Sequence, residues 1–296
     1  MPPAGPPERR SPTWPSAAAH VVGVMGEPVG HSLSPLLHNA AFDALGLDWV
    51  SVGFPVPAGG VPAAFAGIRA LGIVGLSVTM PHKEDAAAAV DTLTPVATRL
   101  GAVNCVVRED GMLVGDSTDG AGFVASLHRG PGFDPAGARC VVVGAGGAAR
   151  AVVLALADAG AESVVVVNRS PARAAAAAVL AGAAGSVGDP EAVRHADLVV
   201  QATPVGMARG SATDDMVPFD PDLLRPGQVV ADLVVHPLET PLLRAAAQRG
   251  ATPLPGLGML VHQAALALER WTGRAAPVEA MWRAVQGHLA DRERSG

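Results

Sequence analysis

Short runs of β-branched residues alternate with alanine- and leucine-rich stretches along most of the chain, and this alternation restricts the possible folds more than any other feature. Residues 20–26, 49–56 and 73–79 have the composition of strands, whereas 34–46 and 62–72 between them have that of helices. Strands joined by helices form parallel sheets that are covered by helices. The sequence therefore predicts an α/β fold.

Cap and turn residues locate the ends of several predicted elements. Ser34 is expected to be the N-cap of a helix that ends at Gly46. Asp110-Gly111 separates two valine-containing runs, a pattern typical of the turn of a β-hairpin. Another helix is expected to begin near Asp119.

A second unit begins near Arg139 and alternates strands and helices in the manner of a Rossmann-type nucleotide-binding domain. Two further helical stretches follow it, which either complete this unit or return to the first. We expect a proline-rich, disordered lead-in over residues 1–19, a substrate domain of 20–118 plus 256–296, and a nucleotide-binding domain of 119–255. The active site is expected in the cleft between the two domains.

The segment VVVGAGGAAR joins a predicted strand to a predicted helix and has the spacing of a dinucleotide-binding loop. Gly144 and Gly146 allow a tight turn and a close approach of the backbone to a pyrophosphate, which the start of the helix attracts. Gly147 and Ala148 lie in the same loop. The alternative is a glycine turn of an α/β fold that binds no ligand.

The residues after the next predicted strand favour NADP over NAD. A loop that binds NAD usually has an acidic residue here, whereas this chain has Asn168 and Arg169, with Arg173 one turn later. Guanidinium groups pair with a 2′-phosphate, which a carboxylate would repel. The alternative for Arg169 is an exposed loop charge without a ligand.

Lys83 is the only lysine among 21 basic residues, all the others being arginine. A lysine can exchange a proton near neutral pH when its surroundings lower its pKa, whereas an arginine cannot. The chain also has no tyrosine, which excludes a Tyr–Lys catalytic pair. Lys83 is therefore the candidate acid–base group for the reduction of a carbonyl. A surface lysine without a chemical role is the alternative.

Charge and hydropathy exclude several other classes of protein. The net charge of −6 provides no basic face for nucleic acid, and no apolar run reaches the roughly 18 residues of a membrane span. The N-terminus lacks the apolar segment of a secretion signal. Cys105 and Cys140 have neither metal-ligand nor disulfide spacing, so no metal is expected. We expect a cytoplasmic monomer or homodimer that acts on a small molecule.

Nine separated motifs carry a resemblance to a known family. In chain order they are GEPVGHSLSPLLHNAAF, LSVTMPHK, GAVNCV, GDSTDGAGF, GAGGAARA, NRSPARA, ATPVGM, DLVVHPLETPLL and GLGMLVHQAALA. Together they resemble the shikimate dehydrogenases over about residues 20–290. The resemblance implies two α/β domains and NADP as the cofactor. It also implies the reversible, NADPH-dependent reduction of 3-dehydroshikimate to shikimate, a step towards chorismate and the aromatic amino acids.

The resemblance assigns roles to individual residues. Lys83 and Asp119 are implied to be the catalytic pair, with Asp116 as the nearest alternative to Asp119. The residues implied to hold the substrate are Ser32, Ser34, Thr79, Lys83, Asn104, Asp119 and Gln263. Those implied to hold the cofactor are Gly144, Gly146, Gly147, Ala148, Asn168, Arg169, Arg173, Thr203, Gly256 and Met259.

Three positions depart from the family pattern, all at or near the expected substrate pocket. Ser77 and Ser117 stand where asparagine is usual, and Val235 stands where tyrosine is usual. These departures leave quinate or an amino-substituted relative of shikimate open as the substrate. A non-catalytic, NADP-binding regulator on the same fold is a further alternative, although Lys83 and Asp119 are both present.

Overall fold

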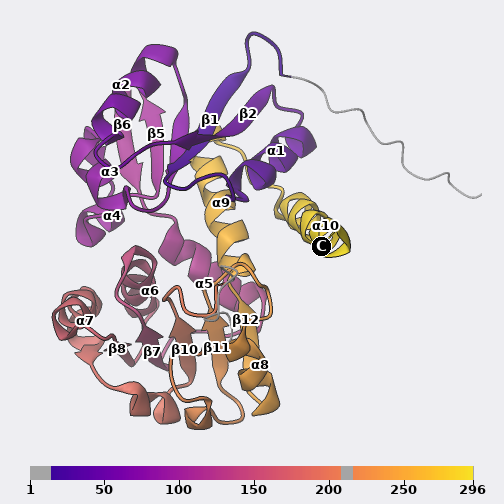
Figure 1. Ribbon diagram of the computed structural model, residues 1–296. Helices are drawn as coiled ribbons and strands as arrows, with labels where there is room; N and C mark the ends of the chain where they lie inside the picture. Colours follow the sequence, from indigo (N-terminus) through magenta and orange to yellow (C-terminus); the bar gives the residue numbers. More distant parts are fainter. Residues whose placement is uncertain (1–14, 208–215, 296) are drawn as a thin grey trace, which may run out of the picture.

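The computed structural model describes residues 15–207 and 216–295, which form two α/β lobes, each built on a six-stranded sheet (Figure 1). The α/β fold predicted from the sequence is confirmed. Of the predicted disordered lead-in, residues 1–14 lie outside the described residues. In the part that is described, the Ser16 backbone and hydroxyl donate to the Asp48 carboxylate just ahead of the first strand.

The sheet of the first lobe is mixed, with the strand order β2-β1-β3-β5-β6-β4. β1, β2 and β3 run parallel, whereas β5 is antiparallel to both β3 and β6. The predicted hairpin is confirmed, since Asp110 and Gly111 have φ angles of 49° and 82°, as a tight two-residue turn requires. The strands are β1 (His20–Gly26), β2 (Trp49–Pro55), β3 (Gly75–Val78), β4 (Thr92–Leu93), β5 (Cys105–Glu109) and β6 (Met112–Asp116).

Helices cover both faces of this sheet, because successive strand side chains point to opposite sides. Leu76 and Val106 pack with the side chains of α2, α3 and α4, whereas Cys105 and Val107 pack with those of α1 and the C-terminal helices. The four helices of this lobe are α1 (Ser34–Leu45), α2 (Val61–Leu71), α3 (Lys83–Ala89) and α4 (Pro95–Leu100).

The prediction that Ser34 is the N-cap of α1 was wrong. Ser34 is the first residue of the helix, and Leu33 occupies the N-cap position without a side-chain hydrogen bond. The reason is that Ser32, two residues upstream, accepts the backbone N–H of Ser34 on its hydroxyl at 3.3 Å. Gly46 ends the helix in the left-handed conformation, as predicted.

The sheet of the second lobe is parallel throughout and has the order β12-β11-β10-β7-β8-β9. The chain first builds one side outwards from β7 and then the other, which is the Rossmann order. Its strands are β7 (Arg139–Val143), β8 (Ser163–Val167), β9 (Gly185–Val187), β10 (Leu198–Gln201), β11 (Val229–Asp232) and β12 (Thr252–Pro255). Its helices are α6 (Gly147–Asp158), α7 (Pro171–Ala178) and α8 (Pro241–Gln248), with short 3₁₀ turns at Val179–Ala184, Pro190–His195 and Pro221–Leu223.

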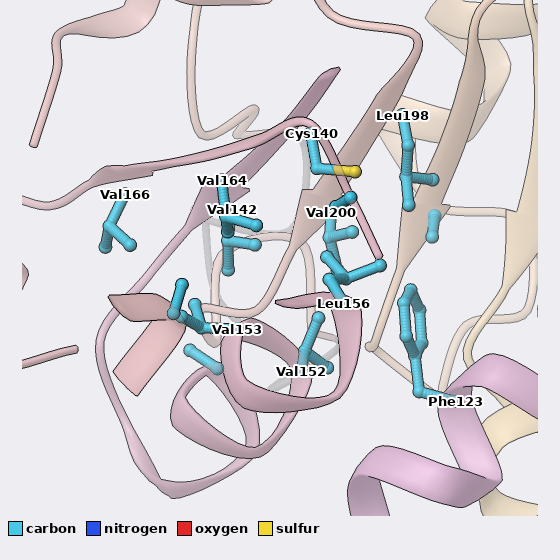
Figure 2. Close-up of a cluster of buried hydrophobic side chains, with 14 of the residues drawn as sticks. Phe123, Cys140, Val142, Val152, Val153, Leu156, Val164, Val166, Leu198 and Val200 are labelled. Atoms are coloured by element: carbon cyan, nitrogen blue, oxygen red, sulfur yellow. The ribbon is translucent and has the colours of Figure 1, made fainter. Parts of the chain in front are cut away.

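Valines and alanines make up most of the main core cluster of the second lobe (Figure 2). Val142 and Val200 of the sheet face Leu156 and its neighbours on α6, and all three are fully buried. Phe123 of helix α5 packs into the same core, although α5 precedes the first strand of this lobe in the chain. The first helix after the β5–β6 hairpin therefore belongs to the core of the Rossmann sheet.

Two helices cross between the lobes, and a third returns to the first lobe (Figure 1). They are α5 (Asp119–Arg129), α9 (Leu257–Thr272) and α10 (Val278–Ser295). α5 and α9 touch at Gly122, where a Cβ atom would lie 2.6 Å from the backbone nitrogen of Gln263. The far end of α9 is fixed to the first sheet, since Trp271 Nε1 donates to the Val106 carbonyl at 3.0 Å. Within the described ranges, no helix has the length and apolar character to cross a membrane.

Candidate active site

Lys83 and Asp119 form an ion pair at the edge of the first sheet. Lys83 begins α3 and Asp119 begins α5, and Lys83 Nζ lies 2.5 Å from Asp119 Oδ2. Their side chains are only 19% and 9% exposed, so water screens the pair weakly. Asp116, the alternative acid, has other partners: it accepts from the Thr94 hydroxyl at 2.7 Å and lies 3.4 Å from Arg270.

Asn104 is the centre of the hydrogen-bond network around this pair. Its amide nitrogen donates to Asp119 Oδ1 at 2.8 Å and to the Gln263 side-chain oxygen at 3.3 Å. Its amide oxygen accepts the backbone N–H of Thr118 at 2.7 Å. Both oxygens of Asp119 are therefore hydrogen-bonded, one to Lys83 and one to Asn104, which fixes the orientation of the carboxylate.

Gln263 reaches this network from α9, 159 residues after Asn104 in the chain. Its amide nitrogen donates to the Leu260 carbonyl at 2.9 Å, and the residue is 8% exposed. The close approach of α9 at Gly122 brings Gln263 this near to Asp119. The first lobe, α5 and α9 thus each supply part of one polar cluster.

The predicted hydroxyl groups lie after the carboxyl ends of β1 and β3. Thr79 follows β3, and its backbone N–H donates to Met25 of β1 at 2.9 Å. Ser32 and Ser34 lie at the start of α1, in the segment that follows β1. Carboxyl ends of neighbouring parallel strands meet at one edge of a sheet, which is where open α/β sheets bind ligands. Among the described residues, no direct hydrogen bond joins these serines to Lys83 or Asp119.

The glycine loop of the second lobe lies against Lys83. A Cβ atom on Gly147 would be 3.6 Å from Lys83 Cδ. Gly144 has a φ of 124° and its Cβ would meet the Ala202 carbonyl at 2.9 Å, so only glycine is tolerated there. At Gly146, the N-cap of α6, nothing lies within 4 Å of a Cβ position. This open space in front of a helix N-terminus fits a phosphate group.

The basic residues after β8, which are predicted to hold the 2′-phosphate of the cofactor, are exposed. Asn168 uses its amide within the turn, donating to the Ser170 carbonyl at 3.1 Å. The Ser170 hydroxyl accepts the Arg173 backbone N–H at the start of α7. The Arg169 and Arg173 side chains are exposed, and in the part of the chain that the structure describes neither guanidinium has an ion-pair or hydrogen-bond partner. Two exposed arginines therefore follow β8, the strand that pairs with the strand leading into the glycine loop.

The remaining predicted cofactor residues have structural partners of their own. The Thr203 hydroxyl accepts the Val205 N–H at 3.2 Å. Gly256 is the N-cap of α9, and a Cβ there would lie 2.7 Å from the backbone of Leu233. Met259 is 8% exposed and packs in the core of the second lobe.

Sequence reasoning missed two residues that organise the site. Thr118 binds Asn104 through its backbone and its hydroxyl, and its position next to Asp119 was the available signal. Arg150, in the first turn of α6, donates to Glu84 at 2.9 Å and to the Leu100 carbonyl at 2.5 Å. Nothing in the local sequence indicates these two partners of Arg150.

The meeting of Lys83 with the Gly147 loop defines the class of protein, an oxidoreductase in which a nucleotide-binding lobe faces a substrate-binding lobe. Residues 24–106 match the model of the shikimate dehydrogenase substrate binding domain, and 256–286 match that of the shikimate 5′-dehydrogenase C-terminal domain. Between them, 139–221 match the family described as NADP oxidoreductase coenzyme F420-dependent. A shikimate dehydrogenase (NADP(+)) of Moorella thermoacetica is 49% identical over 91% of this chain and 94% of its own length. The chain belongs to the shikimate dehydrogenase family.

Solved structures show the same architecture. Shikimate 5-dehydrogenase of Thermus thermophilus, in complex with NADP(H) and shikimate, is 37% identical with a TM-score of 0.84, covering 90% of this chain and 98% of that one. Quinate dehydrogenase of Corynebacterium glutamicum, in complex with NAD, is 31% identical with a TM-score of 0.83, covering 91% and 99%. The shared fold therefore accommodates more than one ring acid and both nicotinamide cofactors.

Proposed function

We propose that this enzyme catalyses the reversible, NADPH-dependent reduction of 3-dehydroshikimate to shikimate. The observation that supports the proposal most directly is the Lys83–Asp119 pair, whose atoms lie 2.5 Å apart beside the Gly147 loop. The names of the Moorella relative and of the Thermus complex support the same substrate and cofactor.

In this proposal the Lys83 ammonium is the proton donor of the reduction. NADPH, when bound, supplies the hydride to the carbonyl carbon. Lys83 donates a proton to the oxygen on which negative charge develops, and its own charge stabilises that oxygen before the transfer. Asp119 holds the ammonium in place, and Asn104 holds the second carboxylate oxygen. In the oxidation direction Lys83 takes up the proton from the ring hydroxyl.

The surrounding polar groups suit a hydroxylated ring that carries a carboxylate. Asn104 and Gln263 each offer an amide, and amides can both donate to and accept from ring hydroxyls. Ser32 and Ser34 lie at the N-terminus of α1, where an anion is favoured. A ligand that lacks a hydroxyl would leave buried amide groups without a partner, which discriminates strongly against it.

A comparison of two aspartates tests the catalytic assignment. Asp119→Asn and Lys83→Met should each lower kcat for 3-dehydroshikimate by about 10²- to 10⁴-fold, the usual contribution of a positioned acid–base group. Asp116→Asn is the matched control, because Asp116 lies three residues away and bonds to Thr94 and Arg270 instead. NADPH consumption at 340 nm gives the rates. Near-normal turnover of Lys83→Met would contradict the mechanism, and any 3-dehydroshikimate-dependent NADPH consumption excludes a non-catalytic regulator.

The choice of cofactor is tested at the two free arginines. In the double variant Arg169→Gln, Arg173→Gln, the KM for NADP should rise by at least tenfold, because two charge-assisted contacts to the 2′-phosphate are lost. The KM for NAD, which lacks that phosphate, should hardly change and serves as the internal control. Equal effects on both cofactors would refute the assignment of these residues to the 2′-phosphate.

Quinate is the second candidate substrate. The buried Ser77 hydroxyl has no hydrogen-bond partner among the described residues, and Val235 packs with apolar side chains of the first lobe. Ser77 is shorter than the asparagine that is usual in the family, and Val235 is shorter than the usual tyrosine. The pocket therefore favours a ring with different substituents from those of shikimate. The quinate dehydrogenase that shares this fold supports the possibility. Initial rates with shikimate, quinate and an amino-substituted analogue decide the question, and a strong preference for shikimate eliminates the alternative.

A further inference from the structure

A cavity of about 260 Å³ lies on the side of α9 that does not carry Gln263. It is bordered by the C-terminal end of α5, the end of β12, the first turns of α9, the loop before α8, and α10. His262 lines this cavity, whereas the next residue, Gln263, joins the Asp119 network. Consecutive side chains on a helix diverge by about 100°, so His262 and Gln263 point in different directions from α9.

The walls of this cavity are mainly apolar. Leu238, Leu254, Leu257 and the indole of Trp282 line it. They come from the loop before α8, β12, α9 and α10, elements that meet only in the folded chain. An aromatic wall next to branched aliphatic side chains suits one flat, apolar ring. A ring with several hydroxyls would have to bury them without enough partners, which is unfavourable.

Two nitrogen-bearing side chains, those of His262 and Arg129, adjoin these walls. His262 is 7% exposed, lines the cavity, and makes no side-chain hydrogen bond within the described ranges. Burial lowers the pKa of His262, and the nearby charge of Arg129 lowers it further. Arg129 itself is exposed at the end of α5 and has no ion-pair or hydrogen-bond partner among the residues described. The imidazole and the guanidinium are therefore two neighbouring polar groups at the edge of an otherwise apolar cavity, placed where a polar group of a ligand can reach both.

We propose that this cavity binds a compact aromatic monocarboxylate. The carboxylate would pair with the Arg129 guanidinium and accept a hydrogen bond from the His262 ring, while the aromatic ring lies against Trp282 and the leucines. The volume admits one ring with a short acidic side chain and is too small for a dinucleotide. The site is separate from Lys83 and Asp119, so its proposed ligand can be tested independently of the proposed reaction.

Phenylacetate is the probe, and phenylacetamide is its neutral control. Titration calorimetry on the full-length protein should give a Kd for phenylacetate on the order of a millimolar, as expected for a ligand of about ten non-hydrogen atoms. Phenylacetamide should bind at least tenfold more weakly. Arg129→Gln should weaken phenylacetate binding by at least tenfold, whereas Arg283→Gln, an exposed arginine of α10 that does not line the cavity, should leave it unchanged.

The place of binding is established by fluorine resonances. The chain has four tryptophans, and Trp282→Phe assigns one signal of protein labelled with 5-fluorotryptophan. Phenylacetate should shift the Trp282 signal, with saturating NADP and shikimate present as well as without them. Displacement of phenylacetate by shikimate would place the probe in the active site and overturn the proposal. An unchanged Trp282 signal, equal binding by Arg129→Gln, or no binding at 20-fold the expected Kd would also overturn it.

Discussion

Arg150 connects the two lobes next to the active site, and its replacement tests which of its two contacts matters. From α6 it reaches Glu84 of α3 and the carbonyl of Leu100 at the end of α4. The proposed perturbation is Arg150→Met, which keeps most of the aliphatic stem and removes the guanidinium. The comparison variant is Glu84→Gln, which removes only the ion pair.

The two contacts differ in their expected energies because they differ in exposure. Glu84 is 73% exposed, so its ion pair is screened and should contribute about 0.2–1 kcal/mol. The bond to the Leu100 carbonyl is partly buried and charge-assisted, and such bonds contribute about 1.5–3 kcal/mol. Arg150→Met should therefore lower the free energy of unfolding by about 2–3 kcal/mol, and Glu84→Gln by less than about 1 kcal/mol.

Scanning calorimetry of the purified variants measures the difference. For a chain of this length 1 kcal/mol corresponds to about 2–4 °C, so Arg150→Met should unfold about 4–12 °C below the unchanged protein. Arg99→Met is the matched control: its ion pair with Asp158 also joins α4 to α6, but both side chains are about half exposed, at 50% and 48%. An effect of Glu84→Gln or Arg99→Met as large as that of Arg150→Met would refute the reasoning from burial.

Three further predictions concern buried titratable groups. Burial raises the pKa of Asp232 to about 6, so the folded state holds this proton more tightly than the unfolded state, and stability is lost as the pH rises from about 4 to 6. From pH 4 to pH 7, the free energy of unfolding of Asp232→Asn should therefore rise by up to about 3 kcal/mol relative to that of the unchanged protein. Unfolding experiments at both pH values measure this change. Burial lowers the pKa of His38 to about 4, so the unfolded chain takes up a proton below about pH 6.5 while the folded protein does not. The effect on stability has the opposite sign to that of Asp232, because here stability is lost as the pH falls. His38→Gln should remove about 3 kcal/mol of acid destabilisation between pH 6.5 and 4, and an unchanged pH slope would contradict this. Burial raises the thiol pKa of Cys105, and it raises that of Cys140 to about 12, so a disulfide reagent at pH 8 should label neither in the folded protein and both after denaturation.

Local sequence signals predicted those parts of the fold whose cause lies within a few residues. The hairpin at Asp110–Gly111, the end of α1 at Gly46 and the start of α5 at Asp119 all follow from the conformational preferences of nearby residues. The glycine loop was recognisable for the same reason, because Gly144 needs a backbone conformation that other residues rarely adopt. The single lysine indicated where chemistry was to be expected.

The edge strands show where local signals fail. β4, β9 and β12 are two to four residues long and lie at the edges of their sheets. Two of the four residues of β12 are prolines, which argue against a strand unless it lies at an edge. Edge position is a property of the assembled sheet, so the sequence of β12 could not reveal it.

The sequence by itself determined the α/β class, the position of the glycine loop and the identity of the one lysine, since each depends on residue type and spacing along the chain. Only the tertiary structure decided that Asn104 lies between Asp119 and Gln263, that Arg150 joins the lobes, and that α9 places Gln263 in the polar cluster and His262 in a cavity. These contacts join segments as far as 159 residues apart. Their geometry depends on how whole helices and sheets pack, for example on the close crossing of α5 and α9, and that packing is a sum over many distant side chains rather than a property of any short stretch.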